Sequence, residues 1–221
     1  MPATASRYDG FADWYDEWNA PHIDRNAAEI LDLIGPGHGL CLDLGCGTGQ
    51  YTAALRGSGR TVVGLDRSAD QLRRARARCG QLVQADAAAL PFRTASFGTV
   101  VTLWISTDVD DFPAVLAEAA RVLQPGGLLL FYGAHPCFNG PHTEWREDGG
   151  IVAHPTYRIA GWQQESPWWG YNVRRRVGMR HYPLPDLLNG IIASGLNLEH
   201  VAEHGDRAVP VNLAIRARKP S

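Results

Sequence analysis

Five short apolar runs, separated by segments with a helical pattern, constrain the fold of this chain more than any other feature. The runs occupy residues 39–44, 61–66, 81–86, 97–104 and 128–133. Strands that alternate with helices in this way form a parallel sheet with helices on both faces. Ligands of such sheets bind beyond the carboxyl ends of the strands, where the strand order reverses. The residues that follow each run are therefore the first candidates for a functional site.

Local signals mark the helices between these runs. One helical segment starts at Tyr51 and stops at the glycines that follow it. Ser68 is a typical N-cap for a helix that continues through Arg78. The stretch Phe112–Leu123 has helical spacing, and the Pro-Gly-Gly sequence at 125–127 is expected to end it.

The alternating pattern stops after Gly133. Residues 134–182 are rich in Pro, Gly, His and Trp, and a long insertion without periodicity is typically a binding loop or lid. We therefore expect a cap over the functional edge of the sheet, with an irregular structural flap as the alternative. An amphipathic helix that ends at Gly195 follows, and then two strands that are expected to be antiparallel. Four of the seven tryptophans fall in the cap, namely Trp145, Trp162, Trp168 and Trp169.

Charge and composition exclude several classes of protein. With 21 Lys and Arg against 23 Asp and Glu, the net charge is −2, which gives no general attraction to nucleic acid or to an anionic membrane. No apolar run approaches the roughly 20 residues that span a bilayer, and the N-terminal sequence lacks the pattern of a signal peptide. We therefore expect a cytoplasmic protein with neither nucleic-acid nor membrane partners. The four cysteines have no paired spacing, so no metal site and no disulfide framework are expected.

Glycines follow the first apolar run. The run ends at Asp43 and Leu44, and Gly45, Gly47 and Gly49 then stand at alternate positions ahead of a helix. Glycine lets the backbone approach a ligand closely and take up positive φ angles. The spacing differs from the G-x-G-x-x-G fingerprint of dinucleotide-binding proteins, which disfavours an oxidoreductase.

Aspartates follow the second and third runs. Asp66 ends the second run, where a carboxylate can accept both ribose hydroxyl protons of an adenosine ligand. Asp86 and Ala87 end the third run, where a carboxylate can accept from an adenine amino group and a small residue leaves room for the ring. Three such elements after three successive strands favour an adenosyl ligand.

Several segments together resemble the class I S-adenosylmethionine-dependent methyltransferases. They are LDLGCGTGQYTAAL, VVGLDRS, QADAAALPF, FGTVVTLW and ARVLQPGGLLLF, and the resemblance covers residues 8–133. It implies an α/β fold with a Rossmann-like, doubly wound sheet of seven strands, the last of them antiparallel. It also implies S-adenosyl-L-methionine as the cofactor and S-adenosyl-L-homocysteine as the product.

The resemblance also implies a role for each motif residue. Residues after the first strand would hold the methionine part of the cofactor, and those after the second would bind the ribose. Residues after the third strand would line the adenine, and those after the fourth would close the other side. In chain order they are Asp43, Gly45, Cys46, Gly47 and Gly49; Asp66 and Arg67; Asp86 and Ala87; and Leu103 and Trp104.

The N-terminal sequence YDGFADWYD, residues 8–16, resembles the opening helix of the family, whose aromatic residues fold over the cofactor. Tyr8 and Tyr15 could face the carboxylate or the sulfonium of the cofactor, because a cation above an aromatic ring gains about 0.5–2 kcal/mol. The alternative is an amphipathic helix that packs on the sheet.

We expect one methyltransferase domain over residues 1–221. Its expected parts are an N-terminal helical lid (1–35), a cofactor-binding core (36–133), a substrate cap inserted after the fifth strand (134–182), and a closing helix with strands (183–221). The acceptor would lie between the helix at 8–18, the cap and the ends of the fourth and fifth strands.

Candidate acid–base residues follow the fourth and fifth strands, since a hydroxyl acceptor benefits from a general base. Many family members carry a histidine near the positions of Thr107 and Asp108, and this chain does not. The catalytic candidates are His135, His181 and Asp108. The alternative for each histidine is a hydrogen-bonded packing residue.

These features favour methyl transfer by in-line displacement to a small-molecule acceptor, at an oxygen atom. The cap tryptophans favour an apolar or aromatic acceptor. The run Arg174-Arg175-Arg176 could bind an acidic substrate or form a solvated face. The alternatives are an RNA or protein methyltransferase and a non-enzymatic protein that binds S-adenosylmethionine. A homodimer, in which a second subunit completes the cap, stays open.

Overall fold

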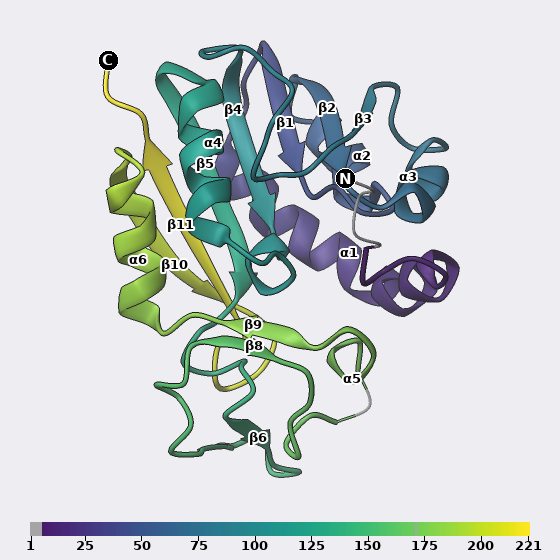
Figure 1. Ribbon diagram of the computed structural model, residues 1–221, viewed down its shortest axis with the longest axis vertical. Coiled ribbons are helices and arrows are strands. Elements are labelled where there is room, and N and C mark those ends of the chain that lie inside the picture. Colours follow the sequence, from purple (N-terminus) through teal and green to yellow (C-terminus); the bar gives the residue numbers. More distant parts are fainter. Residues whose placement is uncertain (1–5, 171) are drawn as a thin grey trace.

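The computed structural model describes residues 6–170 and 172–221, and its centre is a sheet of seven strands (Figure 1). In chain order these are β1 (Leu40–Leu44), β2 (Thr61–Asp66), β3 (Leu82–Gln84), β4 (Phe97–Leu103), β5 (Leu123–Ala134), β10 (Asn197–His204) and β11 (Asn212–Arg218). Their order across the sheet is β10-β11-β5-β4-β1-β2-β3. The order reverses between β1 and β4, so a ligand crevice is expected at their carboxyl ends.

One strand of this sheet is antiparallel to its neighbours. Strands β1 to β5 pair in parallel, whereas β11 pairs antiparallel with both β5 and β10. A short loop is enough to join β10 to β11, because antiparallel neighbours need no helical crossover. The doubly wound sheet of seven strands with an antiparallel last strand is therefore confirmed.

Helices cover both faces of the sheet. α1 (Ala12–Ile34) and α2 (Gln50–Arg56) pack on one face, and α4 (Phe112–Val122) and α6 (Leu184–Ala193) pack on the other. Cys41 of β1 belongs to the apolar cluster that contains residues of α1 and α2. Leu42 belongs to the cluster that contains residues of α4 and α6. A strand buried on both faces needs a continuous apolar sequence, which explains the run that β1 shows. No helix in the described part of the chain is long and apolar enough to cross a membrane.

Two boundaries differ from those that the sequence predicts. α3 (Ala69–Ala75) has the expected Ser68 N-cap, but it ends three residues before Arg78, in a turn. β5 begins at Leu123, so the Pro-Gly-Gly sequence at 125–127 lies inside a strand. The register explains this, because Phe97 pairs with Leu123 and Thr99 with Leu128. The residues between Leu123 and Leu128 therefore bulge from the ladder without ending it.

The N-terminal helix is longer than expected and begins later. α1 starts at Ala12, and its start is held by Asp70 of α3, whose Oδ2 accepts hydrogen bonds from the backbone N–H groups of Gly10 (3.0 Å) and Ala12 (3.2 Å). Residues 7–10 form turns ahead of it. The first five residues of the predicted lid lie outside the described part of the chain.

The cap lies beyond the carboxyl ends of the sheet, where the arrowheads of β4 and β5 point (Figure 1). It contains one hairpin of β6 (Thr143–Trp145) with β7 (Ile151–Ala153). A second antiparallel pair joins β8 (Gly161–Gln163) to β9 (Met179–His181), and the short helix α5 (Arg174–Val177) precedes β9. The strands have three residues each, which is too short for a period to show in the sequence.

Candidate active site

A cavity of about 300 Å³ lies at the carboxyl ends of β1, β2 and β4. A smaller compartment of about 40 Å³ adjoins it, and the two share lining residues. These are Tyr15 of α1, Gly45 and Gly47 of the loop after β1, and Leu103 and Trp104 at the end of β4. The cavity therefore lies at the switch point of the sheet, where the strand order predicts it.

The glycine loop needs its glycines for space as well as for conformation. Gly45, Gly47 and Gly49 all have positive φ, at 80°, 54° and 77°. A Cβ atom on Gly45 would lie 2.7 Å from Ile105 Cδ1, and one on Gly49 would lie 2.8 Å from Cys79 Sγ. The backbone N–H groups of Gly45 and Cys46 donate to the Leu65 carbonyl, which ties the loop to β2. A side chain at Gly45 or Gly49 would therefore force its neighbours to move, whereas a Cβ atom on Gly47 would lie 3.6 Å from the nearest atom, Gln71 Oε1.

Asp66 lines the larger compartment and also holds the glycine loop. Its two carboxylate oxygens accept hydrogen bonds from the backbone N–H groups of Gly47 and Ser68, both at 2.9 Å. Burial raises the pKa of Asp66, and these two bonds offset part of the rise. One side chain therefore shapes the loop and faces the ligand space.

Asp43 lines the smaller compartment with one oxygen unpaired. Thr52 Oγ1 donates to Asp43 Oδ2, whereas the buried Oδ1 has no hydrogen-bond partner among the described residues. Burial raises the pKa of Asp43 to about 7. An ammonium group in this compartment would satisfy Oδ1 and favour the charged carboxylate.

Gln71 is a site residue that the sequence analysis missed. It lies in the first turn of α3, it is 2% exposed, and it lines the larger compartment. Neither Oε1 nor Nε2 has a hydrogen-bond partner among the described residues, and a buried polar atom without a partner costs about 1–3 kcal/mol. Its spacing from the Ser68 N-cap, which turns it toward the glycine loop, was the only signal in the sequence.

The far end of the larger compartment follows β3. Asp86 and Ala87 line it, and Asp86 Oδ1 accepts a hydrogen bond from the Ala88 backbone N–H (2.9 Å). Ala87 is buried and presents only a methyl group. Arg67 lines the same compartment beside Asp66. A small residue and a carboxylate therefore meet at the place where the resemblance puts the adenine.

Trp104 has a strained backbone at the junction of the two compartments. Its φ of 56° is in the left-handed region, which costs a non-glycine residue about 1–3 kcal/mol. Its ring packs between those of Tyr51 (4.8 Å between centroids) and Tyr132 (4.9 Å). The turn aims a flat aromatic face at the space that Leu103 and the glycine loop also line.

Tyr8 and Tyr15 cover the cavity from the N-terminal side. Their rings meet edge to face, with centroids 5.2 Å apart, and both line the larger compartment. Tyr8 donates a hydrogen bond to Asp108 Oδ1 (3.0 Å), which follows the 3-10 turn η1 (Ile105–Thr107). Burial is the main cause that raises the pKa of both phenols, so they are neutral hydrogen-bond donors at pH 7.

Of the three catalytic candidates, only Asp108 lines the cavity. His135 is buried outside the cavity. Its Nε2 meets Glu203 Oε1 (2.9 Å), and its Nδ1 accepts a hydrogen bond from the Cys137 N–H (3.1 Å). His181 Nε2 meets the Tyr157 carbonyl at 2.8 Å, inside the cap. Burial is the main cause that lowers the pKa of both histidines. The structure gives both the contacts of packing residues.

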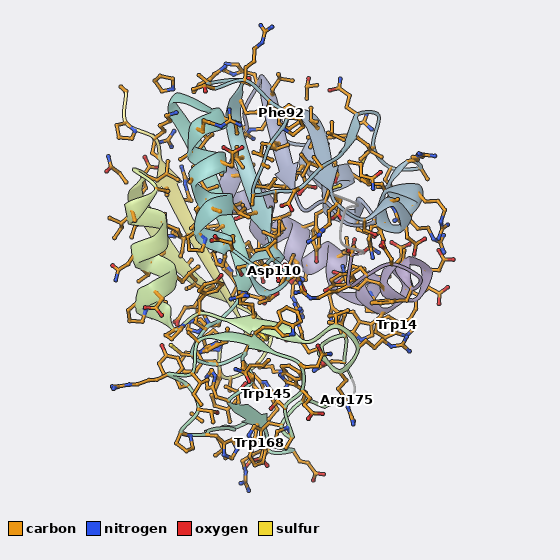
Figure 2. The ribbon with its side chains drawn as sticks, viewed as in Figure 1. Trp14, Phe92, Asp110, Trp145, Trp168 and Arg175 are labelled. Carbon is orange, nitrogen blue, oxygen red and sulfur yellow. The ribbon has the colours of Figure 1, made fainter. Side chains whose placement is uncertain are left out.

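The cap tryptophans also lie away from the cavity, and none of the four lines it. Trp168 stacks on His154 with centroids 3.6 Å apart, and Arg207 lies over Trp145. Figure 2 shows Trp145 and Trp168 at the far end of the cap. Trp162 instead contacts the N-terminal segment, because the Arg7 guanidinium lies over its ring. Trp168 thus packs within the cap, whereas Trp145 and Trp162 contact arginines of segments outside it.

Residues 42–131 match the family model described as "Methyltransferase domain". The match runs from β1 to β5 and contains the glycine loop, Asp66, Asp86 and Trp104. The fold, the site at the switch point and this match define the class. Residues 42–131 form a methyltransferase domain of the S-adenosylmethionine-dependent class I type.

Curated relatives are similar over the same part of the chain. A malonyl-[acyl-carrier protein] O-methyltransferase of Serratia marcescens is 36% identical over 58% of this chain and 51% of its own length. A demethylmenaquinone methyltransferase of Mycobacterium marinum is 37% identical over 57% of each chain. A fatty-acid O-methyltransferase of Mycolicibacterium smegmatis is 36% identical over 47% of this chain and 40% of its own length. The chain thus spans about half the length of the curated relatives it matches.

A solved structure shows the same fold over almost the whole chain. It is an S-adenosylmethionine-dependent methyltransferase from Mesorhizobium loti, with a TM-score of 0.70 and 24% identity, covering 96% of this chain and 99% of that one. The family implies S-adenosylmethionine as the cofactor, and the residues present fit it. Three buried polar atoms without partners, Asp43 Oδ1 and the two amide atoms of Gln71, belong to residues that line the two compartments.

Proposed function

We propose that this protein transfers a methyl group from S-adenosylmethionine to an oxygen atom of a small molecule. The observation that carries this proposal is the pair of compartments at the switch point, where buried polar atoms of Asp43 and Gln71 have no partner among the described residues. The names of two relatives support oxygen as the acceptor atom, because both are O-methyltransferases. The demethylmenaquinone relative supports a small-molecule acceptor.

In this proposal the smaller compartment takes the methionine part of the cofactor and the larger one takes the adenosine. Asp43 Oδ1 accepts from the ammonium group, and the glycine loop follows the methionine chain, with Cys46 beside it. Asp66 and Gln71 bind the ribose, next to Arg67. Asp86, Ala87 and Leu103 line the adenine and its other face. The unpaired buried atoms of Asp43 and Gln71 support the assignments of the methionine part and the ribose.

The cofactor supplies an electrophilic methyl group when it is bound, so the protein has to orient the acceptor and exclude water. Tyr8, Tyr15 and Trp104 bring aromatic faces to the cavity, where each near a cation contributes about 0.5–2 kcal/mol. Asp108 positions Tyr8 through their hydrogen bond. His135 and His181 position the cap in this proposal, rather than moving a proton.

The division of the chain into a lid (1–35), a cofactor core (36–133), a cap (134–182) and a closing segment (183–221) is part of the same proposal. Contacts between the first and third parts support it: Arg7 lies over Trp162, and Arg176 lies over Trp14. An apolar acceptor and a homodimer stay predictions, since the described residues show neither.

Thermal unfolding with S-adenosylhomocysteine tests the proposal. At 100 times its Kd, a ligand stabilises the folded state by about 2.7 kcal/mol, so the melting temperature should rise clearly. Asp66→Ala should remove most of this shift, whereas Asp148→Ala, at an exposed position of the cap, should keep it. Stabilisation by NAD without any shift from S-adenosylhomocysteine would contradict the proposal.

A further inference from the structure

The three arginines of the run at 174–176 have different surroundings. The Arg174 side chain is 14% exposed and reaches Asp108. Arg176 lies over the Trp14 ring, 4.1 Å from its centroid. Arg175 is exposed, at the outer edge of the cap (Figure 2). The run is therefore neither a uniform basic face nor a single binding site, and only Arg174 reaches the cavity lining.

Arg174 brings more hydrogen-bond donors than its protein partners use. Its Nη1 donates to Asp108 Oδ1 (2.6 Å), and its Nη2 donates to Thr107 Oγ1 (2.7 Å) with a long contact to Asp108 Oδ2 (3.5 Å). A guanidinium has five N–H groups. Among the described residues, nothing accepts from its Nε–H or from the second N–H of Nη1. The guanidinium can therefore bind a second carboxylate beside Asp108.

The Tyr15 hydroxyl is a second unused donor nearby. Tyr15 lines both compartments, and no described residue forms a hydrogen bond with its hydroxyl. Arg174 and Tyr8 both donate to Asp108 Oδ1 (2.6 and 3.0 Å), and the Tyr8 and Tyr15 ring centroids lie 5.2 Å apart. A guanidinium and a phenol are both donors that bind a carboxylate.

No described histidine lines the cavity, and each aspartate that lines it already accepts at least one hydrogen bond from the protein; these are Asp66, Asp86, Asp108, Asp110 and Asp111. Both oxygens of Asp108 and of Asp66 already accept hydrogen bonds from the protein. His135 and His181 lie outside the lining. The free oxygen of Asp43 lies in the compartment assigned to the cofactor's ammonium group. An acceptor that is already deprotonated at pH 7 needs no base, and carboxylic acids meet that condition.

We propose that the acceptor is a carboxylic acid, whose carboxylate is bound by Arg174 and Tyr15. This inference rests on the proposed function. A lone pair of the carboxylate oxygen forms the new bond to the methyl carbon, and the bond between that carbon and sulfur breaks with its electron pair moving to sulfur. The products are a methyl ester and S-adenosylhomocysteine, and no proton is transferred. The positive charge of Arg174 holds the anionic nucleophile in line.

The first test compares classes of acceptor on the full chain with labelled S-adenosylmethionine. The acids are decanoic, hexadecanoic, benzoic and phenylacetic acid, and each is paired with the alcohol or phenol of the same skeleton. We expect label only with acids, in products that mild alkali hydrolyses to labelled methanol. Label in ethers that resist alkali would overturn the inference and leave the proposed function standing.

The second test uses neighbouring arginines as a matched pair. Arg174→Met should raise the KM for the acid at least about tenfold, the effect of losing a charged hydrogen bond of roughly 1.4 kcal/mol. Arg175→Met should leave KM unchanged. Arg174→Lys keeps the charge and should recover part of the loss. Equal KM values for Arg174→Met and Arg175→Met would refute the role of Arg174.

Because Arg174→Met leaves Asp108 without its ion pair, the double variant Arg174→Met with Asp108→Asn serves as a folding control. Both proteins should keep the melting-temperature shift with S-adenosylhomocysteine. If no acid is methylated, and none raises the melting temperature of the protein loaded with S-adenosylhomocysteine, the carboxylate inference fails. Failure of the proposed function is separate, since it requires that S-adenosylhomocysteine itself does not bind.

Discussion

The cofactor cavity and the cap differ in how they treat buried polar groups. In the cavity, Asp43 and Gln71 keep buried atoms that no described residue satisfies. In the cap, His135 bonds through both ring nitrogens, and His181 bonds the Tyr157 carbonyl. His142 donates a hydrogen bond through Nε2 to the Cys137 carbonyl, although its Nδ1 and the buried Nε of Arg180 have no partner among the described residues.

This difference distinguishes a surface built for a ligand from one built for packing. A protein loses stability by burying an unpaired polar atom, so such atoms persist where a ligand supplies the missing partner. Polar groups that bond to their own backbone instead stabilise irregular structure. Histidines in the cap looked catalytic in the sequence because residue type alone does not reveal the partner.

Two glycines with the same backbone angle give the largest expected contrast. Gly49 in the cofactor loop has φ 77°, and Gly149 in the cap has φ 83°, but only Gly49 would crowd neighbours if it gained a Cβ. Gly49→Ala combines strain with overpacking, about 3 kcal/mol, and should raise the Kd for S-adenosylhomocysteine roughly 100-fold. Gly149→Ala should leave the Kd unchanged. Calorimetric titration of both variants measures this, and equal Kd values would contradict the role of the loop.

Gln71→Leu should separate ligand binding from folding. Removing two unpaired buried atoms should leave the melting temperature of the free protein unchanged or higher, because no protein hydrogen bond is lost. The Kd for S-adenosylhomocysteine should rise about tenfold. Gln81→Leu, on the exposed surface, is the control. A fall in the melting temperature of the free protein with an unchanged Kd would assign Gln71 to packing.

Asp43 should make cofactor binding depend on pH. Its folded pKa of about 7 lies above the value near 3.9 of an unfolded chain, so its contribution to stability is complete below pH 3.9 and is lost as pH rises through 7. An ammonium ligand favours the charged carboxylate, so binding of S-adenosylhomocysteine should tighten as pH rises toward 7, by up to about tenfold per pH unit, and should level off above that pH. Titration in buffers of different ionisation enthalpy should detect the released proton. Asp43→Asn should abolish both effects.

The cap should respond to pH in the opposite direction. Burial lowers the folded pKa of His135, His142 and His181 below the unfolded value near 6.5. Their neutral forms stabilise the fold fully above that value, and stability falls as pH drops below it, by at most about 1.4 kcal/mol per pH unit for each proton taken up. Urea unfolding between pH 8 and 5 measures the slope. His142→Gln should reduce the slope, whereas His200→Gln, at an exposed position, should not. Identical slopes in the two variants would show that His142 of the cap does not cause the pH dependence.

The sequence was sufficient for the core of the fold. Each apolar run between residues 39 and 133 overlaps one of the five parallel strands, since a strand buried on both faces leaves a continuous apolar sequence. The boundary at Leu123 was wrong because a bulge absorbed a Pro-Gly-Gly sequence that ordinarily ends an element. The cap strands escaped prediction because three residues are too few to show alternation.

Prediction of the site followed the same division. Motif residues such as Asp66 and Trp104 line the cavity, because their positions are fixed by strand ends. Gln71 could not be found, and Arg174 could not be distinguished from the other arginines of its run, because both depend on contacts between distant segments. Arg174 meets Asp108, which is 66 residues away in the chain, and its neighbour Arg175 has the same sequence character without the contact.

The two backbone hydrogen bonds of Asp66 determine what its variants can measure. A substitution there changes ligand contacts and loop geometry together, so a lost affinity is the sum of two free energies that no single variant at this position separates. The Gln71 side chain forms no hydrogen bond with the described residues, so its substitution reports the ligand contact alone. A double-mutant cycle between Asp66 and Gln71 would therefore measure the part of the binding free energy that the two side chains share. The rest of the loss at Asp66 would measure how far the glycine loop is organised before the cofactor binds.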